Sequence, residues 1–199
     1  DLTIVSDEIY KHILYDGRTH ESTAKLSDEL KERTIIADGV AKTYAMTGWR
    51  IGWLIAPPAF AKAADNPQSQ ETSNANSIAQ WASIEALTGP QESVEQMRAA
   101  FAERRDVLVP ALNEIPGVKC ANPGGAFYVF PDISAHLGRT LGGMEIKTSI
   151  DMELYLIEQA LIATVAGGPF GTEGYIRLSF ATGMDQIKEG VRRLAQALK

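Results

Sequence analysis

Cysteine is almost absent from this chain, since Cys120 is the only one among 199 residues. No disulfide can form within the chain, which is compatible with a reducing compartment, and we predict a cytoplasmic protein. We expect Cys120 to be a small core residue. No apolar stretch is long enough to span a bilayer, and the first residues lack the basic and hydrophobic regions of a secretory signal. A membrane is therefore not expected as a partner.

Positive charge is also scarce. The chain has 19 Lys and Arg against 25 Asp and Glu, a formal net charge of -6. Binding to a phosphate backbone draws on clustered basic residues, so nucleic acid is not expected as a partner. The pairs Arg104-Arg105 and Arg192-Arg193 are expected on solvated helix faces. With 45% hydrophobic residues the chain can bury a substantial core, which argues against disorder and suggests one or two domains.

The stretch GVAKTYAMTGWRIG, residues 39–52, is the most informative part of the chain. It places Lys42 in a turn between two apolar runs and Arg50 eight residues later. A lysine can form a Schiff base with an aldehyde, and an arginine offers a planar fork of donors that fits a phosphate. Asp7 follows the apolar run 2–5, where a parallel strand would deliver a functional group to the carboxyl edge of a sheet. Pyridoxal phosphate (PLP) carries both an aldehyde and a phosphate, and it needs a partner for its ring nitrogen.

The same stretch resembles the lysine attachment motif of class I/II PLP-dependent aminotransferases, the fold type I family. Three further segments agree with the family in order and content: SDEIY at 6–10, NPGGAFYVFP at 122–131 and YIRLSFATG at 175–183. The resemblance extends over essentially the whole chain. It is closest to the aspartate/aromatic aminotransferase-like branch.

The resemblance implies a role for each matching residue. Lys42 would hold the cofactor covalently and then act as the base that moves the Cα proton of the substrate. Asp7 would bind the ring nitrogen, Tyr10 the phenolic oxygen of the ring and Arg50 the phosphate. Arg177 would donate two parallel hydrogen bonds to the α-carboxylate of the amino acid. No metal site is predicted.

Two positions depart from the common pattern of the family. Asp38 and Ala41 stand where many relatives have Asn and Ser, so a phosphate hydrogen bond from a serine next to the lysine is lost. Residues 166–169 stand where a Pro-Gly turn is usual. We therefore expect this loop to have its own shape.

The fold class implied is α/β. Residues 1–89 would be the C-terminal portion of a PLP-binding large domain with a mostly parallel sheet, and residues 90–199 a smaller α+β domain that includes the interdomain helix. The chain begins in what should be a buried parallel strand, so we expect it to be the C-terminal half of a longer protein. Family members are homodimers, and we expect a homodimer of the full chain. The fragment alone is expected to expose apolar sheet edges, aggregate and be inactive.

Periodicity and turn signals predict the individual elements. Strands are predicted at residues 2–5, 34–37, 51–55, 117–120, 126–130, 162–165 and 175–180. Helices are predicted at residues 27–31, 59–64, 77–87, 91–114, 152–159 and 184–199, with a kink at Pro110. The polar stretch 66–76 and residues 138–143 are predicted as loops. Gly124 and Gly125 are predicted to form a tight turn near the mouth of the active site, where glycine tolerates a positive φ and close approach of the substrate.

The predicted reaction is transamination of an L-amino acid with a 2-oxo acid by a ping-pong mechanism. Aspartate with 2-oxoglutarate is the first choice of substrates. Residues 66–76 contain no Arg or Lys, so a distal carboxylate is not expected to be bound by an arginine from this region. The alternatives are an aminotransferase for aromatic or other amino acids, a PLP-dependent lyase on the same scaffold, and a non-catalytic aminotransferase-like sensor domain.

Overall fold

The computed structural model describes residues 2–199, which form two compact units. The first unit ends at Arg98 and the second runs from Ala99 to Lys199. The long helix α4 (Glu92–Asn113) contributes to both. The predicted domain division at residues 89 and 90 stays a prediction. Within residues 2–199, no helix combines the length and the apolar character needed to cross a membrane.

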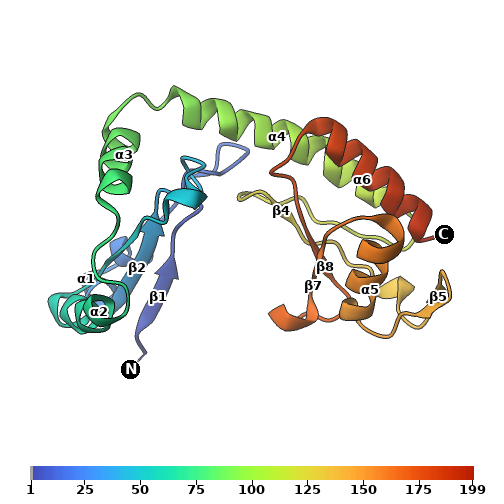
Figure 1. The fold of residues 1–199 in the computed structure, drawn as a ribbon, viewed down its shortest axis with the longest axis horizontal. Helices are drawn as coiled ribbons and strands as arrows, with labels where there is room; N and C mark the ends of the chain where they lie inside the picture. The colour runs from blue at the N-terminus through green and yellow to red at the C-terminus, as the bar shows by residue number, and fades with distance from the viewer. Residues whose placement is uncertain (1) are drawn as a thin grey trace. The chain divides into compact units, whose positions relative to one another are not determined.

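The first unit is built on a three-stranded sheet in the order β1-β2-β3 (Figure 1). The strands are β1 (Ile4–Asp7), β2 (Thr34–Gly39) and β3 (Gly52–Ile55), close to the predicted positions. β1 and β2 are parallel, whereas β2 and β3 are antiparallel. The connection from β2 to β3 holds only the short 3₁₀ turn η2 (Thr47–Trp49), too little chain for the crossover that a parallel pair requires. β3 therefore returns alongside β2 in the opposite direction.

Helices complete the first unit: η1 (Thr23–Lys25), α1 (Asp28–Lys31), α2 (Pro58–Glu71) and α3 (Ser77–Thr88). Ser27 caps α1 and Asn76 caps α3, each accepting a main-chain N–H at 3.1 Å, which confirms both predicted helix starts. α2 is longer than predicted and includes the first part of the polar stretch 66–76. No residue of α2 is buried, so the sequence contains no apolar stripe that could have predicted its full length.

The second unit holds a sheet in the order β4-β8-β7 and a separate hairpin. The sheet strands are β4 (Tyr128–Val129), β7 (Val165–Ala166) and β8 (Ile176–Ser179), and both pairings are antiparallel. The hairpin joins β5 (Thr140–Leu141) to β6 (Met144–Glu145), so the prediction of a loop at 138–143 was wrong. Gly142 and Gly143 have φ of 54° and 87°, and two consecutive positive φ values suit the tight turn of a hairpin.

One predicted strand of the second unit is not formed. Residues 117–120 make only a single bridge, in which Lys119 and Asp132 exchange two main-chain hydrogen bonds of 3.0 and 2.8 Å. The segment is apolar enough for a strand, but Gly117 at φ 81° turns the chain immediately before it. Cys120 within it is buried, as predicted, and burial raises the pKa of its thiol to about 11.

Helices cover the second unit: α5 (Ser149–Tyr155), its π-helical continuation η4 (Leu156–Ala160) and α6 (Met184–Ala197), with short turns η3 (Ser134–His136) and η5 (Gly168–Phe170). A capping box between Thr148 and Asp151 fixes the start of α5. The helical spacing of the apolar residues at 184–199 predicts a core face, and Ile187, Leu194 and Leu198 are buried, whereas Met184 and Val191 are only half-buried. The core of this unit also contains Leu112, Val129, Ile133, Met152, Leu156, Ile176 and Phe180.

Candidate active site

Three of the predicted site residues lie at one edge of the first sheet. Asp7 is the last residue of β1 and is paired with Ala37 of the parallel strand β2. Lys42 follows the end of β2, and Figure 1 shows β1 and β2 running in the same direction. Arg50 comes just before β3, whose first residue Gly52 pairs with Gly39, the last residue of β2. The ends of β1 and β2 and the start of β3 therefore meet at the same edge, and the topology brings these three residues to it.

The turn that carries Lys42 is tightly wound. The main-chain N–H of Tyr44 donates to the carbonyl of Val40 at 3.2 Å, and that of Ala45 donates to the carbonyl of Lys42 at 3.3 Å. Ala45 has a φ of 53°, in the left-handed region that a residue with a side chain rarely occupies. Lys42 itself is half-buried. The lysine thus lies on a turn whose main chain is fixed by its own hydrogen bonds.

Gly39 allows the two strand ends that flank this turn to approach each other. A Cβ added to Gly39 would lie 2.8 Å from the carbonyl oxygen of Ile51 and 3.0 Å from the Cα of Gly52. The first distance is shorter than real Cβ contacts and the second is very tight, so alanine at this position would push β2 and β3 apart. The glycine therefore helps to set the distance between the segments that bear Lys42 and Arg50.

Arg50 also has a left-handed main chain, with a φ of 56°. Its side chain is exposed, and its Nη1 donates to the carbonyl of Thr47 at 2.8 Å. Asp7 is exposed as well, and its Oδ1 accepts the main-chain N–H of Ile9 at 3.2 Å. Tyr10 lies in the turn that follows β1, where its carbonyl accepts the N–H of Ile13 at 2.9 Å. A carboxylate and a guanidinium are thus both presented at the surface of this edge.

Glu8 is a buried carboxylate that the sequence argument missed. It is only 6% exposed, and its Oε1 accepts hydrogen bonds from Ser22 at 2.6 Å and from Ser6 at 3.2 Å. Its Oε2 lies 2.9 Å from Nε2 of His20. Burial by itself would raise the pKa of Glu8, but the hydrogen bonds from Ser22, His20 and Ser6 hold it below its usual value. Glu8 therefore ties the long loop after β1 to the strand that ends in Asp7.

A second ion pair joins the loops at the same edge. The ammonium of Lys11 contacts the carboxylate of Asp38, which is buried and also accepts the N–H of Gly39 at 2.8 Å. Burial, and then the neighbouring Lys11, lower the pKa of His12. Asp38 is one of the departures from the family pattern noted in the sequence. In this chain its charge is used to pair the end of β2 with the loop that follows β1.

Arg177, the predicted substrate residue, lies in β8 of the second unit. Within residues 2–199 it forms no ion pair with a carboxylate. Its guanidinium carbon lies instead 4.6 Å from the ring centroid of Tyr128 and 4.9 Å from that of Phe170. A structural role as the partner of a helix carboxylate is therefore not supported.

The turn at residues 122–126 differs from the prediction. The positive φ falls on Ala126, at 58°, rather than on Gly124 or Gly125. Arg105 of α4 donates to the carbonyl of Pro123 at 3.0 Å and contacts Asp106 at 2.8 Å. Arg105 is only 3% exposed, so the prediction that it lies on a solvated helix face was wrong. It holds the start of this turn instead, which no sequence pattern indicated.

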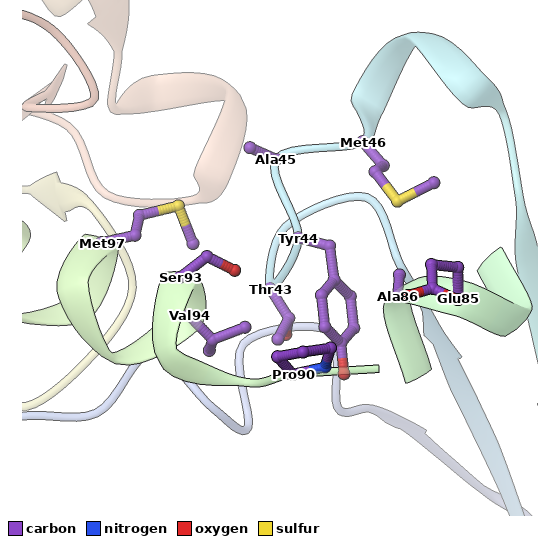
Figure 2. A pocket seen from close by; sticks show the side chains of 10 residues that line it. All are labelled: Thr43, Tyr44, Ala45, Met46, Glu85, Ala86, Pro90, Ser93, Val94 and Met97. Carbon is purple, nitrogen blue, oxygen red and sulfur yellow. The ribbon is translucent and has the colours of Figure 1, made fainter. Parts of the chain in front are cut away.

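The cavity shown in Figure 2 lies beside the Lys42 turn but does not contain the predicted site residues. It has a volume of about 330 Å³ and is lined by Thr43–Met46, by Glu85 and Ala86 of α3, and by Pro90, Ser93, Val94 and Met97 at the start of α4. Tyr44 reaches across it, and its hydroxyl lies 3.1 Å from Oε1 of Gln91. The cavity is a mainly apolar space between the turn and the residues of α3 and of the start of α4 that line it.

Comparison with known proteins agrees with the family that the motifs indicate. A family model described as aminotransferase class I and II matches residues 1–197. The chain belongs to this family. It is 44% identical over 197 residues to an aspartate aminotransferase of Streptomyces avermitilis, covering 99% of this chain and 48% of that protein. It is also 44% identical over 200 residues to an aspartate/prephenate aminotransferase of Nitrosomonas europaea, covering 100% of this chain and 50% of that protein.

Solved aminotransferase structures confirm the fold. The crystal structure of the aspartate aminotransferase from Rhizobium meliloti matches with a TM-score of 0.92 at 43% identity, over 98% of this chain and 49% of that one. The mixed helix and strand content is consistent with the predicted α/β class. The chain spans about half the length of the curated relatives it matches.

The side chains at the sheet edge fit the cofactor that aminotransferases of this family generally use. PLP needs an amine for its aldehyde, an acid for its ring nitrogen and donors for its phosphate. Lys42, Asp7 and Arg50 carry an amine, a carboxylate and a guanidinium at adjoining strand ends. The donor set is therefore chemically suited to PLP.

Proposed function

We propose that the protein of which this chain is part is a PLP-dependent aminotransferase. The observation that carries the proposal is the meeting of Asp7, Lys42 and Arg50 at one sheet edge in a chain of the aminotransferase family. When bound, PLP supplies an aldehyde that an amine can join and a ring that accepts electron density from the substrate. The protein must supply the rest: attachment, orientation and movement of one proton.

Each residue at the edge has a distinct task. Lys42 would hold the cofactor through its Nζ, and its amine is the base that would take the proton from the Cα of the amino acid. Asp7, as a carboxylate, would accept a hydrogen bond from the ring nitrogen and favour its protonated form. Tyr10 would donate a hydrogen bond from its hydroxyl to the phenolic oxygen of the ring. Arg50 presents its planar fork to the phosphate.

Arg177 binds the α-carboxylate of the substrate. Two parallel N–H···O bonds from a guanidinium fix both the charge and the orientation of a carboxylate. The lack of a carboxylate partner for Arg177 within residues 2–199 supports this role. The amino acid and the 2-oxo acid would bind in turn, as a ping-pong mechanism requires.

Aspartate with 2-oxoglutarate is the substrate pair that we propose first. The name of the Streptomyces avermitilis relative supports aspartate as the amino donor, and the name of the Nitrosomonas europaea relative adds prephenate as a second candidate amino acceptor. Residues 66–76 contain no Arg or Lys, so any distal carboxylate is bound from elsewhere in the full protein. We also propose that the first unit belongs to the cofactor-binding domain, that the second is the small domain, and that the full protein is a cytoplasmic homodimer.

The full-length protein with PLP tests the assignment of Lys42. The unmodified protein should show a visible absorption band that borohydride abolishes by fixing the cofactor to the chain, and Lys42→Ala should not. Lys62→Ala, which removes an exposed lysine of α2, is the matched control and should keep the band. Equal spectra for Lys42→Ala and the unmodified protein would refute the assignment.

A second assay separates the competing reactions. Formation of glutamate from 2-oxoglutarate in the presence of aspartate demonstrates transamination. A lyase would release its product without forming glutamate, and a sensor domain would bind PLP without turnover. Either result would overturn the proposed activity while leaving the cofactor site in place.

A further inference from the structure

The surroundings of Arg177 are aromatic. Its guanidinium carbon lies over the rings of Tyr128 and Phe170, 4.6 and 4.9 Å from their centroids. Both distances are within the range of cation–π attraction. Phe170 keeps 53% of its surface exposed, so burial in a core does not account for its position. The contact with the guanidinium is therefore the feature that accounts for the position of this ring.

Tyr128 is placed by the sheet. It is paired with Ser179 in the antiparallel β4–β8 ladder, which puts it diagonally across from Arg177. Side chains in diagonal positions on one face of an antiparallel pair are within reach when they are long or aromatic. The register of two strands thus fixes the first ring.

Phe170 is placed by a loop that closes on itself. The N–H of Gly167 donates to the carbonyl of Tyr175 at 2.8 Å, and the N–H of Thr172 donates back to the carbonyl of Gly167 at 3.1 Å. A Cβ at Gly167 would lie 2.7 Å from the Tyr175 oxygen, so only glycine fits there. This is the loop at 166–169 whose sequence departs from the usual Pro-Gly turn. Phe130 packs edge-on against Phe170, with ring centroids 6.3 Å apart.

The start of α5 holds the same loop in place. The N–H of Gly168 donates to the hydroxyl of Ser149 at 3.0 Å. The carboxylate of Glu173 accepts the N–H of Ser149 and, at 3.1 Å, the N–H of Gly174. These hydrogen bonds lower the pKa of Glu173, which keeps it charged at neutral pH. The main chain on both sides of Phe170 is therefore anchored.

We propose that Phe170, together with Tyr128, positions the guanidinium of Arg177 for the carboxylate of the substrate. A guanidinium donates hydrogen bonds only in its own plane, so rings that cover its weakly hydrated faces leave every donor available. They also restrict the rotamers of a long side chain that would otherwise be free to move. Arg177 is thus held ready before the substrate arrives, which lowers the cost of binding. The inference rests on the proposed role of Arg177, and Phe170 acts through that residue.

The test uses the full-length protein loaded with PLP. Its first readout is the dissociation constant of two unreactive carboxylates, maleate and 3-phenylpropanoate. Phe170→Leu and Phe170→Met remove the ring but keep an apolar side chain, and each should weaken both ligands about 2- to 5-fold. Phe170→Tyr retains the ring and should restore the affinity. The absorbance of bound PLP and the melting temperature should not change.

Steady-state kinetics add a second measurement, the separate effects on KM and kcat, that a merely structural role of Phe170 would not produce. The KM for the amino acid should rise by the same factor as the dissociation constants, with a smaller change in kcat. Wild-type affinity in both Phe170→Leu and Phe170→Met would overturn the inference. A loss that Phe170→Tyr does not restore would overturn it too, because the ring would then not be the cause.

A double-mutant cycle separates this inference from the proposed function. If the ring acts through the guanidinium, adding Phe170→Leu to Arg177→Met should weaken binding no further than Arg177→Met alone. Additive losses would show that Phe170 contacts the substrate directly, and the inference would be wrong. If Arg177→Met leaves carboxylate affinity unchanged, the proposed role of Arg177 fails, and the inference fails with it.

Discussion

Replacing Glu8 by glutamine tests whether a buried charge holds the loop after β1. The carboxylate accepts hydrogen bonds from Ser22 and Ser6 through Oε1 and faces His20 through Oε2. The carbonyl oxygen of glutamine can still accept from both serines, but its amide group then faces His20 and cannot accept. The variant loses the charge assistance of two hydrogen bonds and the acceptor of a third. We expect the free energy of unfolding to fall by about 1.5–3 kcal/mol.

The measurement is urea denaturation of the full-length protein without PLP at neutral pH. Glu29→Gln is the matched control, because the carboxylate of Glu29 is 80% exposed and pairs only with Arg33 on the helix surface. That change should cost about 0.5 kcal/mol or less. If Glu8→Gln destabilises the protein no more than Glu29→Gln does, the charge of Glu8 does not hold the loop.

The stability that the charge of Glu8 contributes should be lost at acidic pH. The pKa of Glu8 is lower in the folded protein than the value of 4.5 for a free glutamate. The charge therefore contributes its full stability above about pH 4.5, and this contribution is lost as the pH falls through the folded pKa. The gap in stability between the unmodified protein and Glu8→Gln should shrink below that pH. A gap that stays constant from neutral to acidic pH would contradict the reasoning.

Three further predictions concern stability and reactivity. Gly39→Ala should lower the free energy of unfolding by about 1–3 kcal/mol, because the new Cβ would lie 2.8 Å from a neighbouring main-chain oxygen. Gly48→Ala, where an added Cβ meets nothing within 4 Å, should cost clearly less, and equal costs in urea denaturation would refute the steric argument. Arg105→Met should cost about 2 kcal/mol by leaving a loop carbonyl without its donor, whereas Arg104→Met on the neighbouring, less buried arginine should cost less, as melting temperatures can test. Cys120 should react slowly with iodoacetamide at about pH 8, since burial raises the pKa of the thiol to about 11 and blocks access, and rapidly after unfolding; equal rates would show that the thiol is accessible.

The linear pattern was sufficient for elements with a strong local signal. The apolar, β-branched runs gave β1, β2 and β3 near their predicted places, and the helices predicted at residues 27–31 and 77–87 are formed as α1 and α3. The pattern failed where a segment has no apolar period. The solvated second half of α2 and the hairpin at Gly142 and Gly143 are of this kind. Both elements are defined by main-chain conformation and hydrogen bonds, and neither leaves a periodic apolar pattern in the sequence.

The candidate site shows the same division. Motif matches singled out Asp7, Lys42 and Arg50, and the register of β1, β2 and β3 explains why they share an edge. Glu8 directly follows Asp7 in the same motif. Successive side chains of an extended chain point to opposite sides, so Glu8 could have been expected to point away from the side that Asp7 faces. Its partners Ser22 and His20 lie in a loop that carries no pattern. Only the folded chain could show that this carboxylate is buried and bonded.

By itself the sequence determined the family and most of the secondary structure and proposed the site residues, because all three rest on motifs and on local periodicity. The tertiary structure decided which charges are buried, as with Glu8, Asp38 and Arg105, and which side chains surround Arg177. Those features depend on contacts between segments far apart in the chain. Burial and partner distance set the energy of a charge, and neither quantity exists until the chain has folded.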